Sequence, residues 1–265
     1  MSGHIDPALV ELKHLFFVSL SQNDFCYNPI PEFLGSLTEL KTLDLSHARF
    51  EGKIPPQLGN LTKLQHFDLS EDYGDLSVDN LSSLQLLKLN YLNLSKVACI
   101  GSLKHLDLEW NDLQQWVPYY LANLENLREL DLFTNKLNGN LSKLHFFGHI
   151  PANIGQIMFD LWYFDASNNN ITGNIPSSIG NLKGMFALDL SGNELSGNTP
   201  PSFSNMAFLN LNDNELFGSS LSSLGALEGL DVLELANNRL SGELPQALKN
   251  GSSLTTLDLS YNEFA

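Results

Sequence analysis

Leucines and other apolar residues return along this chain with a period of about 24 residues. Within each repeat they alternate with polar residues over five positions, as in Thr42-Leu43-Asp44-Leu45-Ser46. Alternation with a period of two predicts a short strand with one buried face. An asparagine follows most of these strands, and a Gly-x-Ile-Pro segment comes after it at 52–55, 148–151 and 173–176. The chain therefore repeats one strand and one turn many times.

Aligning the repeats on the second leucine of each strand gives about eleven coils, separated by steps of 19 to 34 residues. The aligned positions are Leu20, Leu45, Leu69, Leu89, Leu108, Leu132, Ala166, Leu190, Leu211, Leu235 and Leu259. Repeats of this length bury their apolar face only against neighbours, which is typical of a leucine-rich-repeat solenoid. We predict an α/β solenoid, a horseshoe or superhelix, as a single domain over 1–265. Its parallel β-sheet is expected on the concave face and an irregular or 3-10 segment on the convex side.

Two stretches depart from the repeat. The asparagine, expected to satisfy backbone groups of neighbouring turns, is replaced at Ala48, Asp72 and Leu92, and coils at about 70–120 are expected to be irregular. The 34-residue step holds two repeat tails and one strand, which predicts a spliced or bulged coil at about 135–155. Neither end carries a capping segment, so we expect exposed apolar core there, covered by a partner or by self-association.

Composition limits the classes of partner and of chemistry. The net charge of -16 argues against nucleic acid and anionic membranes, whereas basic proteins or neutral sugars fit better. Much of this charge recurs at one strand position, which favours a structural role over catalysis because a catalytic carboxylate pair would be unique. The acids are Asp44, Asp68, Asp107, Asp131, Asp165, Asp189 and Asp258.

Other chemical signatures are missing from the sequence. It shows no phosphate loop, zinc signature or nucleophile elbow, so we expect no enzyme activity, no cofactor and no metal site. It contains no signal peptide and no apolar run long enough to span a membrane. Cys26 and Cys99 fall in the first and fourth coils, too far apart for a disulfide, which predicts two free thiols.

Outward positions that break the Asp, Ser and Thr pattern gather in coils three to seven, and aromatic residues among them are candidates for binding energy. Single exposed aromatics are ordinary, so the cluster carries the inference. Trp110 and Phe133 are the strongest candidates. The predicted ligand-binding residues are His66, Lys88, Tyr91, His105, Asp107, Glu109, Trp110, Asp131, Phe133 and Tyr163. Sequons for N-glycosylation, little more numerous than chance, occur at Asn60, Asn80, Asn93, Asn140, Asn170 and Asn250.

The repeated phrase resembles the plant extracellular class of leucine-rich repeats. Segments 29–37, 54–61, 164–176 and 235–242 are similar to plant receptor-like proteins of the fungal-xylanase-receptor type. This resemblance implies a cell-surface immune receptor that lacks its own kinase and signals with a receptor kinase. It implies a non-catalytic recognition module for a microbial protein or peptide, on the outer face of the plasma membrane or in the apoplast. The chain departs from this pattern in lacking a signal peptide, capping cysteine pairs, a membrane span and many coils.

Two other functions stay open at this point. The same repeat type occurs in polygalacturonase inhibitors, which suggests a secreted inhibitor of a pathogen cell-wall hydrolase. The missing caps and the spliced coil suggest instead a degenerate fragment with no retained function. The ligand is not named by the sequence, because side chains vary freely on a common frame.

Overall fold

Contacts divide the chain into two compact units. The first comprises residues 1–113 and 119–127, and the second comprises 114–118 and 128–265. The prediction of one continuous domain stays a prediction. The structure is a computed structural model that describes residues 3–70, 75–78, 84–89, 93–97, 102–111, 113, 124, 126–137, 149–200, 203, 206–219, 229–243 and 253–264.

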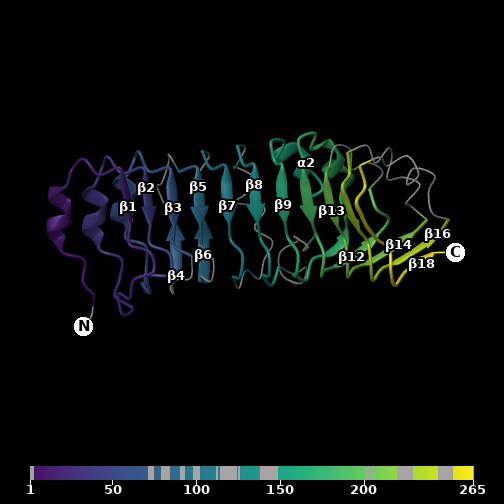
Figure 1. The fold of residues 1–265 in the computed structure, drawn as a ribbon, viewed down its shortest axis with the longest axis horizontal. Helices are drawn as coiled ribbons and strands as arrows, with labels where there is room; N and C mark the ends of the chain where they lie inside the picture. Colours follow the sequence, from purple (N-terminus) through teal and green to yellow (C-terminus); the bar gives the residue numbers. More distant parts are fainter. Residues whose placement is uncertain are drawn as a thin grey trace. The chain divides into compact units, whose positions relative to one another are not determined.

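Short parallel strands alternate with 3-10 helices in the first unit (Figure 1). Its main sheet has the order β1-β2-β3-β5-β7, and β4 pairs with β6 in a separate parallel sheet. The elements are η1 (Pro7–Glu11), β1 (Phe17–Ser19), η2 (Glu32–Ser36), β2 (Thr42–Asp44), η3 (Pro56–Asn60), β3 (His66–Asp68), β4 (Asp75–Val78), β5 (Leu86–Lys88), β6 (Asn93–Val97) and β7 (His105–Asp107).

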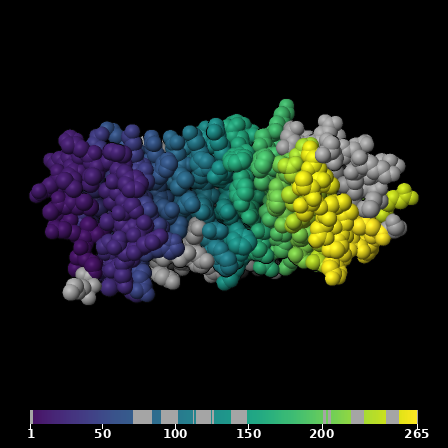
Figure 2. Space-filling view, viewed as in Figure 1, coloured from purple at the N-terminus to yellow at the C-terminus, as the bar shows by residue number. Residues whose placement is uncertain are grey.

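The second unit repeats this plan with a second continuous sheet. Its main sheet has the order β8-β9-β11-β13-β15-β17, and the other has the order β10-β12-β14-β16-β18. In Figure 2 the unit runs from teal to yellow, so successive coils occupy successive bands of its surface. The elements are β8 (Glu129–Asp131), α2 (Ile154–Ile157), β9 (Tyr163–Asp165), β10 (Thr172–Asn174), η4 (Ser177–Asn181), β11 (Ala187–Asp189), β12 (Glu194–Gly197), β13 (Phe208–Asn210), β14 (Glu215–Gly218), β15 (Val232–Glu234), β16 (Arg239–Gly242), β17 (Thr256–Asp258) and β18 (Glu263–Phe264).

The predicted solenoid of parallel strands with 3-10 turns is confirmed, and a strand precedes each aligned leucine. Each strand of the main sheets has three residues, and the middle one points inward because side chains alternate along a strand. Leu43 and Phe67 in the first unit, and Leu130, Phe164 and Leu188 in the second, are almost completely buried. The first and third residues of each strand point outward, and all but Ala187 are half-buried or exposed.

In several coils the asparagine after the strand ties its coil to the preceding one, as the sequence predicted. The Asn193 side chain donates to the carbonyls of Ala166, Leu190 and Ser191 at 3.0 to 3.1 Å, and its Oδ1 accepts from the Ile171 amide at 3.0 Å. Asn169, Asn214 and Asn238 repeat these contacts. We call these asparagines the asparagine ladder. Because they bond only to backbone groups, the ladder does not depend on outward side chains.

The residue before this asparagine adopts a left-handed conformation in most coils. Asn168, Gly192 and Asp213 have φ of 52°, 63° and 55°, values that Asn, Asp and Gly tolerate well. Thr134 and Trp110 take the same conformation, with φ of 48° and 54°. Bulky or β-branched side chains are disfavoured there, so these two positions carry backbone strain.

The 3-10 side requires small residues where coils stack. A Cβ added at Gly155 would overlap the Ser178 carbonyl oxygen, and one at Gly35 would overlap the Gln57 carbonyl oxygen. Pro55 and Pro176 immediately precede 3-10 helices η3 and η4, in the place the sequence predicted. Neighbouring coils are thus closely stacked on the side opposite the main strands.

Several sequence predictions fall outside the described residues. These include residues 71–74, 79–83 and 138–148, so the extent of the irregular stretch and the spliced coil stay predictions. Within 70–120, the register between β4 and β6 shifts at Leu76 and Ser77. Cys26 is an exposed free thiol, and Cys99 lies outside the described residues.

Candidate ligand-binding face

Outward side chains of β8, β9, β11, β13, β15 and β17 form two rows, which together we call the strand face of the second unit. The strand register aligns the first residues of the strands, and it aligns the third residues in the same way. The first row is Glu129, Tyr163, Ala187, Phe208, Val232 and Thr256; the acidic row is Asp131, Asp165, Asp189, Asn210, Glu234 and Asp258. The first row is therefore apolar or aromatic from Tyr163 to Val232, and the acidic row carries a carboxylate at each position except Asn210.

An aromatic pair borders the first row. Trp162 and Phe186 immediately precede β9 and β11, and their ring centroids lie 5.7 Å apart in a tilted arrangement. They remain 40% and 50% exposed, although residues of this size gain most from burial. The Trp162 indole Nε1 donates to Glu129 Oε1 at 3.2 Å, and the Phe186 amide donates to the Trp162 carbonyl at 2.7 Å. The aromatic pair is held in place yet open to solvent.

The aspartates of the acidic row are held by a short turn after their strands, whereas Glu234 accepts from the Asn212 side chain at 3.0 Å. Asp165 Oδ1 accepts from the Ser167 amide at 2.8 Å and from its hydroxyl at 2.7 Å, and Asp189 accepts from Ser191 in the same way. Asn210 also donates to Asp189 Oδ2 at 3.0 Å. The repeated acid thus has the structural role that its register predicted, with one oxygen fixed by the turn.

Asp165 and Asp189 are neighbouring carboxylates of this row. Among the described residues, no lysine, arginine or histidine forms an ion pair with Asp165 or Asp189. Burial raises the pKa of Asp165, and the charge of Asp189 adds to the effect against the hydrogen bonds from Ser167. Burial and the charges of Asp131, Asp165 and Asp189 raise the pKa of Tyr163. The centre of the strand face therefore carries neighbouring negative charges.

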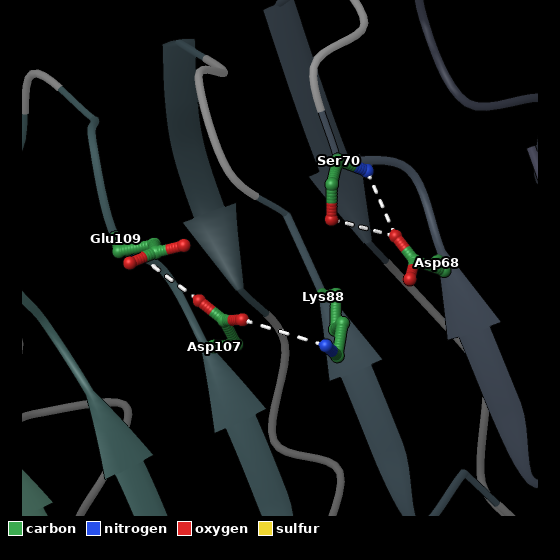
Figure 3. A network of polar contacts seen from close by, with 5 residues as sticks. All are labelled: Asp68, Ser70, Lys88, Asp107 and Glu109. Atoms are coloured by element: carbon green, nitrogen blue, oxygen red, sulfur yellow. Dashed lines mark hydrogen bonds and ion pairs between the residues drawn. The ribbon is translucent and has the colours of Figure 1, made fainter. Parts of the chain in front are cut away.

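Six of the predicted binding residues lie in the first unit. His66 is exposed, and Lys88, His105, Asp107 and Glu109 are half-buried. Figure 3 shows the Lys88 ammonium facing the Asp107 carboxylate at 3.9 Å, while the Glu109 amide donates to the other Asp107 oxygen at 3.2 Å. In the same view, the Ser70 amide and hydroxyl donate to Asp68. Ser167 donates to Asp165 in the same way in the second unit. Lys88 thus lies within ion-pair distance of its acidic neighbour.

The sixth residue, Trp110, lies beyond the end of β7 and not on the strand as the pattern predicted. It occupies the left-handed turn position and stays 43% exposed. Non-glycine residues are uncommon in this conformation, although Gln22, His47, Thr134 and Tyr261 share it in other coils. Strain of this kind gathers at functional sites, which keeps Trp110 a candidate.

Three predicted residues lie in the second unit. Tyr163 and Asp131 belong to the strand face, and the Tyr163 hydroxyl lies 3.5 Å from Asp165 Oδ2. Phe133 follows β8 instead of lying on it, is half-buried, and its amide donates to Asp131 Oδ1 at 3.0 Å. Tyr91 lies outside the described residues.

The predicted glycosylation positions have mixed outcomes. Asn60 and Asn170 are exposed, and Asn170 donates to Glu194 Oε1 at 3.1 Å. Asn93 belongs to β6, while Asn80, Asn140 and Asn250 lie outside the described residues.

Sequence reasoning missed the aromatic pair and Phe208. The signal was present, because the position before the strand is polar at Lys41, Gln65, Gln85, Lys104 and Arg128 but aromatic at Phe16, Trp162 and Phe186, the last two in successive coils. Two aromatics in successive coils at one register position must be neighbours in a parallel sheet. Only the outward strand positions entered the prediction, so this edge was overlooked.

A family model described as Leucine Rich Repeat matches residues 39–61, 160–182, 186–206 and 229–250. Receptor-like protein EIX1 of Solanum lycopersicum is 33% identical over 203 residues, which are 71% of this chain and 19% of that protein. Receptor-like protein 6 of Arabidopsis thaliana is 28% identical over 210 residues, 71% of this chain and 20% of that protein. The chain thus spans about a fifth of the length of these relatives.

Solved structures agree with the fold. A crystal structure of a TDR receptor has a TM-score of 0.85 at 29% identity, covering 99% of this chain and 46% of that one. The HAESA receptor kinase ectodomain from Arabidopsis, in complex with an extended IDA peptide hormone ligand, has a TM-score of 0.57 at 26% identity, covering 98% and 52%. No helix within the described residues is long and apolar enough to cross a membrane. This chain is a leucine-rich-repeat protein whose relatives are plant receptor-like proteins.

Proposed function

We propose that the chain is the ligand-recognition module of a plant cell-surface immune receptor, acting outside the cell on a microbial protein or peptide. The observation that carries the proposal is the solvent-exposed aromatic pair beside the strand face of the second unit. Exposed aromatics on a rigid frame supply large contact area at small entropic cost. The similarity to receptor-like proteins, and to a receptor ectodomain that holds a peptide hormone, supports this assignment.

The proposed function is non-catalytic. The aspartates of the strand face recur at one register position and are held by their own turns, whereas general acid–base chemistry needs a distinct pair in different environments. Signalling would then require a receptor kinase as a partner.

A capture experiment tests the proposal. The full chain, expressed with a secretory leader and immobilised, is exposed to apoplastic fluid from infected leaves, and retained proteins are identified by mass spectrometry. We expect a partner that is retained by the native chain and lost from a Trp162→Ala, Phe186→Ala double variant. Phe217→Ala is the matched control, because Phe217 is 51% exposed but lies on β14 in the other sheet. Equal retention by all three proteins, or no retained partner, contradicts the proposal.

The aromatics predicted from the sequence need their own variant. Trp110→Ala with Phe133→Ala is expected to weaken binding of the captured partner without unfolding the chain. Affinity is measured by surface plasmon resonance, and folding by circular dichroism. Unchanged affinity with an unchanged spectrum removes both residues from the site.

A further inference from the structure

The strand face of the second unit has a charge pattern that selects its ligand. None of its six strands carries a lysine or arginine. Neighbouring carboxylates Asp165 and Asp189 lie in direct register on adjacent strands. Bringing such charges together is unfavourable unless a cation lies between or above them, because like charges in a partly buried site repel. The face is electrostatically complementary to a positive group.

An apolar floor lies next to this charge. Trp162 and Phe186 contribute exposed ring faces, Tyr163 and Phe208 are half-buried in the first row, and Ala187 is a small residue between them. Ala187 is buried between strands that both carry rings at the same position. An apolar or aromatic side chain would be buried well here.

The two features have the spacing of an extended peptide. Tyr163 and Asp165 are two residues apart on one strand, about 7 Å at the rise of a β-strand. Side chains on one face of an extended ligand are also two residues apart, and therefore also about 7 Å apart. One ligand side chain can rest on the apolar floor while the next on the same face reaches the acidic row.

We infer that β9, β11 and β13 bind an extended peptide segment that presents a lysine or arginine two residues from an aromatic or aliphatic side chain. This inference rests on the proposed function and specifies the chemistry of its ligand. Asp165 and Asp189 receive the cation, and Tyr163 receives the apolar side chain. Trp162 and Phe186 extend this apolar floor at its edge, where Glu129 holds the indole in position. An arginine suits the paired carboxylates best, because its planar guanidinium contacts two oxygens at once.

The burial of Asp165 strengthens this selectivity. A partly buried carboxylate gains more from a cation than an exposed one, since solvent screens the interaction less. An acidic segment would be repelled by the same row, and a neutral apolar segment would leave the carboxylates partly desolvated without a partner.

Defined peptides test the inference. The probe is a capped pentapeptide with arginine and phenylalanine two positions apart, and its controls replace the arginine by glutamate or the phenylalanine by alanine. Affinity for the full chain is measured by isothermal titration calorimetry at low and physiological salt. We expect the arginine–phenylalanine peptide to bind at least about tenfold more tightly than either control, and its affinity to fall with salt.

Variants locate the binding. Two double variants are each expected to lower the affinity for the probe by about tenfold or more. One is Asp165→Asn with Asp189→Asn, and the other is Trp162→Ala with Phe186→Ala. The matched control is Asp44→Asn with Asp68→Asn, which alters the same Asp–Ser turns in the first unit and should leave the affinity unchanged. Circular dichroism confirms that each variant is folded.

The inference is overturned if the glutamate peptide binds equally well, if no peptide binds, or if the control pair weakens binding as much as Asp165→Asn with Asp189→Asn. This failure is distinct from failure of the proposed function. A partner captured through Trp162 and Phe186 that the arginine–phenylalanine peptide does not displace leaves a recognition module whose ligand is not basic.

Discussion

At the scale of single residues, two aspartates of the acidic row have pKa values shifted in opposite directions. Burial, reinforced by Asp189, raises the pKa of Asp165, whereas hydrogen bonds from Ser260 lower the pKa of Asp258. A raised pKa means that the folded state binds its proton more tightly than the unfolded state. The Asp165 contribution to stability therefore falls as pH rises between its unfolded and folded pKa values, and stays low above them.

Asp165→Asn should stabilise the chain at neutral pH. The amide oxygen can still accept from Ser167, as Asn210 accepts from the Asn212 amide at 3.1 Å in the same row. The gain should shrink as pH falls toward the unfolded pKa of aspartate, because Asp165 is then protonated. Urea unfolding at several pH values measures it.

Asp258→Asn is the matched control for that experiment, and its expected change in stability at neutral pH is opposite in sign. The lowered pKa of Asp258 means that its carboxylate stabilises the fold above the unfolded pKa, and that this stability is lost as pH falls through the folded pKa. The variant should be less stable than the native chain at neutral pH and equal to it in acid. A stability change of the same sign in both variants would refute burial as the dominant cause of the raised pKa of Asp165.

Two variants of Trp110 measure the backbone strain at this turn. Trp110→Asn should be about 1 kcal/mol more stable than Trp110→Ala, since asparagine tolerates φ of 54° and alanine does not. Both variants lose the ring, so the difference isolates the backbone. Thermal unfolding of the two proteins measures it, and equal midpoints would show that the turn carries no strain.

At the scale of elements, coil stacking depends on glycine where α2 meets η4. Gly155→Ala should destabilise the chain by roughly 1–3 kcal/mol, because the added methyl group overlaps the Ser178 carbonyl. Gly184→Ala is the control, since a methyl group there meets no atom within 4 Å. Chemical denaturation compares the two, and equal loss would mean that the stacking can expand at no cost.

The asparagine ladder should be energetically prominent. Asn193→Ala removes donors to three carbonyls and leaves the Ile171 amide buried without its acceptor, for a loss of at least about 2 kcal/mol. Asn23→Ala is the comparison, because within the described residues Asn23 is exposed and donates to the carbonyls of Leu20 and Ser21. A similar loss at both positions would contradict a role in joining coils.

Elements follow from sequence where one residue type at one repeat position has a single physical role. The inward leucines and the asparagines are such positions, so the strands and the ladder were predictable. The contact between Trp162 and Phe186 was not predicted, because it joins residues in different coils whose polar counterparts elsewhere make the position look unimportant. The turn at Trp110 was missed because tryptophan itself gives no sign of a positive φ.

At the scale of the whole molecule, secretion would bring the exposed sequons into use. Expressed in plant cells behind a secretory leader, the chain should carry glycans at Asn60 and Asn170, which are both exposed. Asn60→Gln and Asn170→Gln should each remove the mass of one glycan, whereas Asn168→Gln, outside any sequon, should remove none. Glycopeptide mapping checks this, and unmodified Asn60 in the secreted protein would disprove it.

The asparagine ladder also allows the residues of the strand face to change independently of coil stacking. Because it bonds only backbone carbonyls and amides of adjacent coils, the outward residues of β9, β11 and β13 can be exchanged without altering how the coils are joined. Specificity can then change coil by coil, and a whole coil can be inserted or removed in register. A receptor built this way can acquire a new ligand while its scaffold stays constant.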